Sequence, residues 1–379
     1  MFQFFFDFIF IYAVEKLFML DRGLDLFQIG LLLFLWSIMT LILEVPSGAI
    51  ADRWSRRKML ILSGLSFSLC YIILIFSNSF GMFLLGFLFR TIGGTFSSGT
   101  LQAYVYDFLK NAKVENKFEK IWGRGNALRT LGIGVAVGLG GWLSEFSYEL
   151  TVGLSALSVI IISAVAYVLP EVKVTKSTEE VNYWKFVKQS LRTVTQNKVL
   201  LKLMFYTAII LAWLASLEEF NDIYLSFLGY SRSVIGLIFA IACLGQSVAS
   251  SVAHKFKHHA WFIINSSVII TVIIMVLASL IKSPYMAIGI LFLGIMLEFM
   301  SVLKEGIIQQ ETKSFQRATV SSVNGLIMNL LPYQLAFGFI ASQYSLQRGY
   351  LVFGIFMMSY FLIILTVGKN KKLPTTPSL

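Results

Sequence analysis

Long apolar runs separated by short polar segments extend through almost the whole chain. Twelve runs reach or approach the ~20 residues that a helix needs to cross ~30 Å of hydrocarbon. Their predicted limits are 3–20, 27–49, 59–77, 81–108, 122–145, 149–169, 199–227, 231–252, 260–281, 285–310, 318–343 and 348–367. The pattern therefore predicts an all-α membrane protein with twelve transmembrane helices.

Composition supports the same class of protein. Of the 379 residues, 57% are apolar and only 13% are charged, and the mean hydropathy is +0.76. Soluble domains usually carry about 25% charged residues. Because so little polar surface could not cover a water-soluble globule, we expect the lipid bilayer to be the solvent.

The net charge is +11, and the basic residues that produce it are unevenly distributed along the chain. In a soluble chain it would suggest nucleic acid, but here the basic residues lie in short loops between the predicted spans. Alternate loops contain most of them, and the loops in between contain four, at Arg22, Arg232, Lys282 and Arg348. The positive-inside rule then predicts a multi-pass protein of the cell membrane with both termini in the cytoplasm, and no nucleic-acid partner.

The longest polar stretch divides the predicted spans into six and six. It covers residues 170–198, and its second part places aromatic and basic residues at helical spacing, as in a helix on the inner membrane surface. We predict an N-terminal bundle over 1–169, this linker over 170–198, a C-terminal bundle over 199–368 and a cytoplasmic tail over 369–379. A weak repeat supports two related halves, because residues 51–54 and 253–256 have similar character in equivalent loops.

The loop between the second and third predicted spans contains the most specific motif. A glycine is followed four residues later by Asp-Arg and then by a basic cluster, at Gly48, Asp52, Arg53, Arg56, Arg57 and Lys58. This loop resembles the signature loop of the major facilitator superfamily, although Ser55 stands where a second glycine is usual. The resemblance covers nearly the whole chain. It implies a secondary transporter in which two six-helix bundles rock about a central site near the midplane.

The same resemblance implies a gate on the cytoplasmic side. Asp52 would cap the start of span eleven, after Arg317, since a helix N-terminus attracts an anion. Arg56 or Arg57 would pair with Asp107, which ends span four. The alternative is that these basic residues are ordinary positive-inside anchors, but that would not account for Gly48 or Asp52.

Two further stretches resemble family patterns. Arg90 opens a glycine-rich face of span four at an estimated depth of ~14 Å, where an arginine is costly unless it faces a wet cavity or a partner. Gly134 and Gly138 form a small-xxx-small pair in span five, resembling a degenerate form of the glycine motif of family exporters. Arg129, near the start of that span, is interpreted as an interface anchor.

Acidic side chains inside the spans are the candidates for proton coupling. Glu298 comes first because it lies near the midplane of span ten, followed by Glu15 and Asp7. Glu15 could pair with Arg90 at similar depth. Glu218 and Asp222 share a face of span seven toward its outer end, where they suit either a cation-attracting vestibule or solvated capping.

The sequence therefore favours proton-coupled efflux of a small amphipathic or cationic compound by a monomeric antiporter. The alternative is a proton-coupled importer of a sugar or an organic anion, with Arg90 recognising the anion. A non-transporting membrane sensor is a third, weaker alternative. No enzyme motif, nucleotide-binding loop or metal cluster is present in the sequence, so we expect no cofactor other than the proton gradient. Tyr104 and Trp213 could stack on an aromatic substrate, but aromatic side chains on such helices more often pack against neighbouring helices.

Overall fold

The computed structural model describes residues 2–172, 198–311 and 331–369, which form helices joined by short loops, with no strand in these ranges. Two compact units are present. Unit 1 comprises Met1–Glu180 and Leu225–Leu244, and unit 2 comprises Val181–Tyr224 and Gly245–Leu379. The predicted division at 170–198 stays a prediction. Most of that linker and nearly all of the predicted tail lie outside the described residues.

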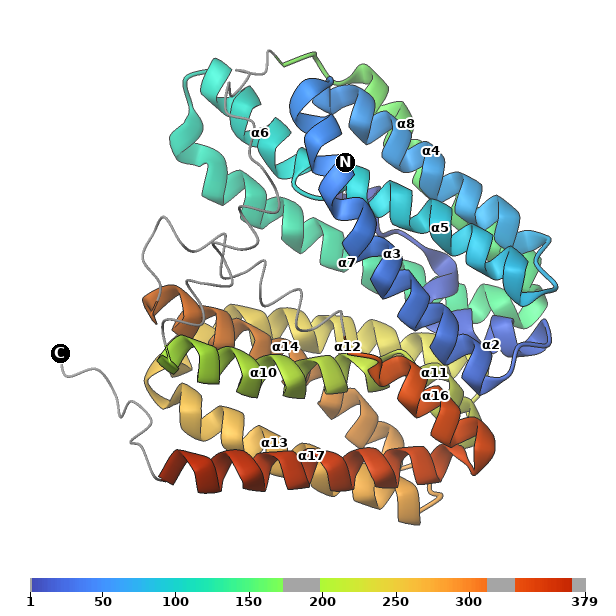
Figure 1. The fold of residues 1–379 in the computed structure, drawn as a ribbon. Helices are drawn as coiled ribbons and strands as arrows, with labels where there is room; N and C mark the ends of the chain where they lie inside the picture. Colours follow the sequence, from blue (N-terminus) through green and yellow to red (C-terminus); the bar gives the residue numbers. More distant parts are fainter. Residues whose placement is uncertain (1, 173–197, 312–330, 370–379) are drawn as a thin grey trace. The chain divides into compact units, whose positions relative to one another are not determined.

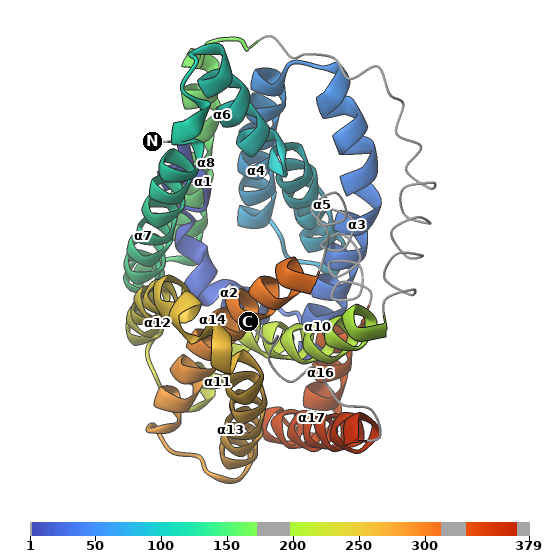
Figure 2. The same cartoon turned by 90° about the vertical axis from the view of Figure 1, so that its left-hand side faces the viewer.

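Unit 1 is built around α4, which packs most extensively on α8 and α5, while α5 also packs on α3 (Figure 1). The turned view shows α3, α4 and α5 as neighbouring helices (Figure 2). The helices of this unit are α1 (Phe2–Phe6), η1 (Phe10–Val14), α2 (Glu15–Asp21), α3 (Leu26–Arg53), α4 (Arg56–Ile75), α5 (Phe80–Ser97), α6 (Thr100–Asn111), η2 (Glu115–Lys117), α7 (Phe118–Phe146) and α8 (Tyr148–Val168).

Unit 2 has its strongest packing between α13 and α17, and between α10 and α14 (Figure 1). Helix α11 begins in unit 2 and ends in unit 1, whereas α12 begins in unit 1 and ends in unit 2. The helices from residue 198 onward are α10 (Lys198–Glu218), α11 (Asn221–Phe227), α12 (Arg232–Ala253), η3 (His254–His259), α13 (Ala260–Leu280), α14 (Met286–Glu311), α16 (Tyr333–Gln343) and α17 (Leu346–Lys369).

Eight helical stretches among the described residues are long and apolar enough to cross a membrane. This supports a multi-pass membrane protein, whereas the predicted number of twelve stays a prediction. Half of the predicted span 318–343 lies outside the described residues, and the predicted span 199–227 is divided between α10 and α11.

The first predicted span, 3–20, is not one continuous helix. The chain leaves α1 after Phe6, passes Ile9 in an extended conformation and continues as the 3-10 helix η1. Two α8 hydroxyls bind the backbone groups that this break releases: Ser158 donates to the carbonyl of Phe8, and Ser155 accepts from the N–H of Ile11 at 3.1 Å. An unsatisfied peptide group in the bilayer costs several kcal/mol, so these hydroxyls make the break possible.

The fourth predicted span, 81–108, is also interrupted. Helix α5 ends at Ser97 and α6 begins at Thr100, because Gly99 adopts a φ of +69° that a side chain would strongly disfavour.

N-terminal capping residues stabilise the starts of two other helices. Asp25 and Gln28 form a capping box at α3, and Ser147 accepts from the N–H of Leu150 at α8.

Candidate functional site

A buried ion pair between Glu15 and Arg90 is the central polar feature of unit 1. Glu15 begins α2 and Arg90 lies in α5, and the Arg90 Nη1 donates to both carboxylate oxygens at 2.9 and 3.0 Å. Glu15 is 1% exposed and Arg90 is 8% exposed. The Nζ of Lys16 lies 3.8 Å from the Oε2 atom of the same carboxylate. The structure thus contains the Glu15–Arg90 pair that the similar depth of the two residues suggested.

Three aromatic rings surround the Arg90 guanidinium. Its central carbon lies 4.6 Å from the ring centroid of Trp36, 4.9 Å from Tyr12 and 5.1 Å from Phe87. These are cation–π distances, and a desolvated contact of this kind contributes up to ~2 kcal/mol. Arg90 is therefore held by the rings as well as by Glu15. We call Tyr12, Trp36 and Phe87 the aromatic cage of Arg90.

A second ion pair joins Asp7, at the break in the first span, to Arg129 of α7. The Arg129 side chain is 45% exposed and also lies over the ring of Phe6, at 5.3 Å. The interface position expected for Arg129 is compatible with this exposure, but its contact with Asp7 was not foreseen. The pair fastens α1 to α7 beside the broken helix.

In unit 2, the carboxylate of Glu218 accepts a hydrogen bond from the Gln246 amide at 3.1 Å, and the same amide contacts the Gly294 carbonyl at 3.4 Å. Asp222 is 3% exposed and accepts from the backbone N–H of Ile223 at 2.9 Å. Both acids are thus anchored near the junction of α10 and α11. Their roles as vestibule or cap stay predictions.

Glu298 differs from these acids. It lies in the middle of α14 and is half-buried. Within the ranges that the structure describes, no hydrogen bond or ion pair engages its side chain. A carboxylate inside a membrane helix is costly unless it meets a cation, a proton or water. The role of Glu298 in proton coupling stays a prediction.

Part of the predicted gate can be followed in the structure. Arg56, at the start of α4, forms an ion pair with Asp107 of α6, and Arg57 lies 5.4 Å above the ring of Tyr167. The surroundings of Gly48 and the side chains of Asp52 and Arg53 are outside the description, and so is the stretch around Arg317. The capping role of Asp52 therefore stays a prediction.

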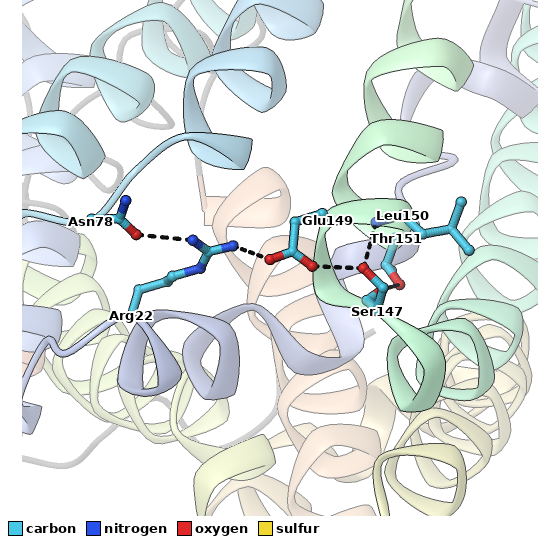
Figure 3. A network of polar contacts seen from close by, with 6 residues as sticks. All are labelled: Arg22, Asn78, Ser147, Glu149, Leu150 and Thr151. Atoms are coloured by element: carbon cyan, nitrogen blue, oxygen red, sulfur yellow. Dashed lines mark hydrogen bonds and ion pairs between the residues drawn. The ribbon is translucent and has the colours of Figure 1, made fainter.

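At the opposite end of unit 1, polar contacts join three loops (Figure 3). Arg22 donates to Asn78 at 2.9 Å and forms an ion pair with Glu149. Glu149 in turn accepts from the Ser147 hydroxyl at 2.6 Å. This network connects the loop before α3, the loop between α4 and α5, and the start of α8. Sequence reasoning did not predict it.

The glycines of α7 allow close helix contacts on two faces. A Cβ on Gly140 would lie 1.8 Å from the Phe10 carbonyl oxygen, and one on Gly141 would lie 2.5 Å from the Arg232 carbonyl oxygen. At Gly134 and Gly138, α12 comes near but leaves room for a methyl group, with nearest atoms at 3.7 and 3.4 Å. The chain therefore approaches α7 more closely at Gly140 and Gly141 than at the predicted pair, Gly134 and Gly138.

Sequence reasoning missed the aromatic cage. Tyr12, Trp36 and Phe87 lie on three different elements and carry no spacing signal in common. The one available signal was indirect, because a buried arginine needs partners. The two aromatics considered as substrate platforms have packing roles here: Tyr104 donates to the Pro170 carbonyl at 2.8 Å, and Trp213 stacks on Tyr333 at 5.1 Å.

Comparison with known proteins places these features in a family. A family model described as Major Facilitator Superfamily matches residues 1–336. Among solved structures, a mutant of the nucleoside transporter NupG matches with a TM-score of 0.84 at 13% identity, covering 96% of this chain and 97% of that one. A bacterial homologue of the human lysosomal transporter Spinster, inward-facing and unoccupied, matches with a TM-score of 0.76 at 16% identity, covering 100% and 96%.

A curated relative is also similar. It is an uncharacterized MFS-type transporter, YxaM, from Bacillus subtilis (strain 168), which is 25% identical over 254 residues. The match covers 64% of this chain and 61% of YxaM, so it spans less than two thirds of the relative. The family consists of membrane transporters and not of enzymes. On the evidence of the family match over most of its length, the chain belongs to the major facilitator superfamily.

Proposed function

We propose that this protein is a proton-coupled secondary transporter that exports a small amphipathic or cationic compound by alternating access. It would act as a monomer in the cell membrane, with both termini in the cytoplasm, and would use the proton gradient without a cofactor. The nucleoside and Spinster-type structures share only 13–16% identity with it. They support the fold alone, so the substrate class is argued from the side chains.

One contrast carries the proposal. The described arginines near the candidate sites are already neutralised, because Arg90 holds Glu15 and Arg129 holds Asp7. Glu298, in contrast, is half-buried in α14 with no hydrogen bond or ion pair in the described ranges. An available carboxylate favours a cationic ligand or a proton over an anion.

This contrast gives a simple exchange mechanism. A cation and a proton would compete for the Glu298 carboxylate, because either one neutralises its charge. Binding of a proton from the outside would then release the substrate cation, and release of that proton to the inside would restore the site for another substrate. The result is antiport of a cation against a proton.

The alternative is proton-coupled import of a small metabolite such as a sugar or an organic anion. An anion would need Arg90, which is occupied on one side by Glu15 at 2.9 Å. Import would therefore require protonation of Glu15 to free the guanidinium for the anion. The two mechanisms use different acids, so single substitutions distinguish them.

The test is proton flux in liposomes that contain the purified protein and an internal pH-sensitive dye. A panel of cationic amphipathic drugs, nucleosides and organic anions would be added in turn, to the wild type and to Glu298→Gln. We expect cationic compounds to drive proton movement at least ten times faster than protein-free liposomes, and Glu298→Gln to abolish that response.

Glu119→Gln is the matched control, because Glu119 is an exposed acid at the start of α7. It should respond like the wild type. Proton flux with organic anions alone, lost in Arg90→Gln and kept in Glu298→Gln, would replace the proposal with the importer. Equal responses of wild type and Glu298→Gln to cations would remove Glu298 from the mechanism.

A further inference from the structure

A basic surface lies at the end of unit 1 where α6 meets α7 (Figure 1). Its five cationic side chains are all exposed, and they are Lys110, Lys113, Lys117, Lys120 and Arg124. In the part of the chain that the structure describes, no side-chain hydrogen bond or ion pair engages any of them. The nearby acid Asp107 is neutralised by Arg56, which leaves Glu115 and Glu119 as the exposed acids of the segment. The surface therefore has an excess of unpaired positive charge.

Aromatic rings lie beside these cations. Phe118 stacks on Trp122, one helical turn later, with their ring centroids 6.0 Å apart and an angle of 13° between the planes. Tyr106 of α6 meets Phe118 edge to face at 5.5 Å. Tyr106 is 44% exposed, and the other two rings are half-buried. We call these three side chains the aromatic stack.

The spacing along α7 separates the cations from the rings. At about 100° of rotation per residue, Lys117, Lys120 and Arg124 fall within about 60° of one another, and we call them the basic face. The two α7 rings of the aromatic stack fall on a neighbouring face. Ile121 projects between the two faces and is 41% exposed, whereas Glu119 lies on a third face. A basic strip and an apolar strip therefore run side by side along the start of α7.

The length of α7 indicates that this end reaches the membrane boundary. The helix has 29 residues, which at ~1.5 Å per residue is about 44 Å, or about 14 Å more than the hydrocarbon thickness of ~30 Å. Its lysine and arginines all lie in its N-terminal half. Because charged side chains are costly in hydrocarbon, the excess length extends mainly from the N-terminal end. The basic face and the aromatic stack then lie at the level of the lipid headgroups, where tryptophan and tyrosine are favoured.

We propose that this surface binds an anionic phospholipid, with the lipid phosphate on the basic face and the acyl chains along the aromatic stack. The charges are complementary, because five unpaired cations face a headgroup of net negative charge. A zwitterionic lipid fits less well, since the cation of its headgroup meets the same positive surface. The predicted orientation places the surface at the cytoplasmic leaflet, in which anionic lipids are found. This inference goes beyond the proposed function and is independent of substrate and direction.

The test compares two lipids that differ only in the headgroup. The purified full-length protein in uncharged detergent micelles would be titrated with phosphatidylglycerol or with phosphatidylcholine of the same acyl chains. Native mass spectrometry gives the apparent Kd of the first lipid bound. We expect phosphatidylglycerol to bind at least ten times more tightly. In the double variant Lys120→Gln with Arg124→Gln, its binding should weaken by about tenfold or more, because each basic residue near an anionic lipid contributes roughly a factor of five.

The matched control removes the same charge elsewhere. Lys255 and Lys257 are exposed in the basic helix η3, which is also predicted to lie inside. Lys255→Gln with Lys257→Gln should leave the first phosphatidylglycerol bound as in the wild type. Both double variants should keep the wild-type melting temperature without lipid, because all four side chains are exposed. Trp122→Leu changes no charge and should still weaken the binding, since it removes part of the aromatic stack.

Three results would overturn the proposal. Equal affinities for the two lipids would exclude selection of an anionic headgroup. Equal losses in the two double variants would show a general effect of net charge and no site at α7. Displacement of phosphatidylglycerol by an equal concentration of glycerol 3-phosphate would assign the basic face to a soluble anion, whereas failure of an excess of glycerol 3-phosphate to displace the lipid would support binding of the whole phospholipid.

Discussion

At the scale of single residues, Arg90 shows how much depth along a helix can predict. Its position near the middle of an apolar run required a partner, and Glu15 was placed at a similar depth by the same argument. The structure brings the two within 2.9 Å. The aromatic cage could not be predicted, because it depends on how η1, α3 and α5 rotate about their axes. When nearly all faces of a helix are apolar, the sequence pattern does not determine which face points toward the neighbouring helices.

The pair should be strongly coupled in its effect on stability. Removal of one partner leaves the other as a buried, uncompensated charge, which typically costs about 3–5 kcal/mol. We therefore expect Arg90→Gln and Glu15→Gln each to lower the free energy of unfolding by this order, and the double variant to lower it by less than the sum. Denaturant unfolding in detergent micelles measures all three. Strictly additive losses would mean that the two side chains do not stabilise one another.

At the scale of elements, helix interruptions are the main difference between prediction and structure. A hydropathy profile predicts continuous helices over 3–20 and 81–108, because it contains no information on the hydrogen-bond partners of the backbone groups. The break after Phe6 depends on Ser155 and Ser158, which are distant in sequence and supply hydrogen bonds from α8. The break at Gly99 had a local signal, since only glycine adopts its positive φ without strain. Glycines within membrane helices are too common for that signal to be specific.

The glycines of α7 permit a test of close packing. An added methyl group at Gly140 or Gly141 would meet a backbone oxygen at 1.8 or 2.5 Å, so neighbouring elements would have to move. Forced overpacking of this kind typically costs about 1–3 kcal/mol. We expect Gly140→Ala and Gly141→Ala each to reduce the melting temperature and the yield of folded protein, as measured by fluorescence-detected size-exclusion chromatography after heating.

Gly123 supplies the internal control, because a Cβ there would contact nothing within 4 Å and the residue lies on the same helix. Gly123→Ala should leave the melting temperature unchanged or raise it slightly, since alanine favours the helix by up to about 1 kcal/mol. If Gly140→Ala and Gly141→Ala were tolerated as well as Gly123→Ala, the close approach of α7 to its neighbours would not be required for stability.

At the scale of the whole molecule, the sequence carried more information than at either smaller scale. Low charge, high hydropathy and the motif around Gly48 pointed to a multi-pass transporter, and the family match over residues 1–336 agrees. This succeeds because the bilayer imposes one requirement, apolar length, on every span. Direction and substrate do not follow from that requirement. They depend on a few side chains, such as Glu298 and Arg90, whose environments the chain pattern does not specify.

The orientation in the membrane can be tested with single cysteines. Neither native cysteine, Cys70 or Cys243, forms a disulfide, and both would first be replaced by alanine. Tyr285 is 82% exposed in the loop between α13 and α14, which is predicted to lie outside. Lys257 is exposed in η3, which is predicted to lie inside with its basic neighbours.

A membrane-impermeant maleimide should label Tyr285→Cys in intact cells and Lys257→Cys only after lysis, because basic loops remain in the cytoplasm. Each variant is the control for the other, since both positions are exposed and differ only in their predicted side. The reverse pattern would contradict the assigned orientation. The Arg56–Asp107 pair would then lie on the outer side, and it could not close the cytoplasmic entrance as the motif implies.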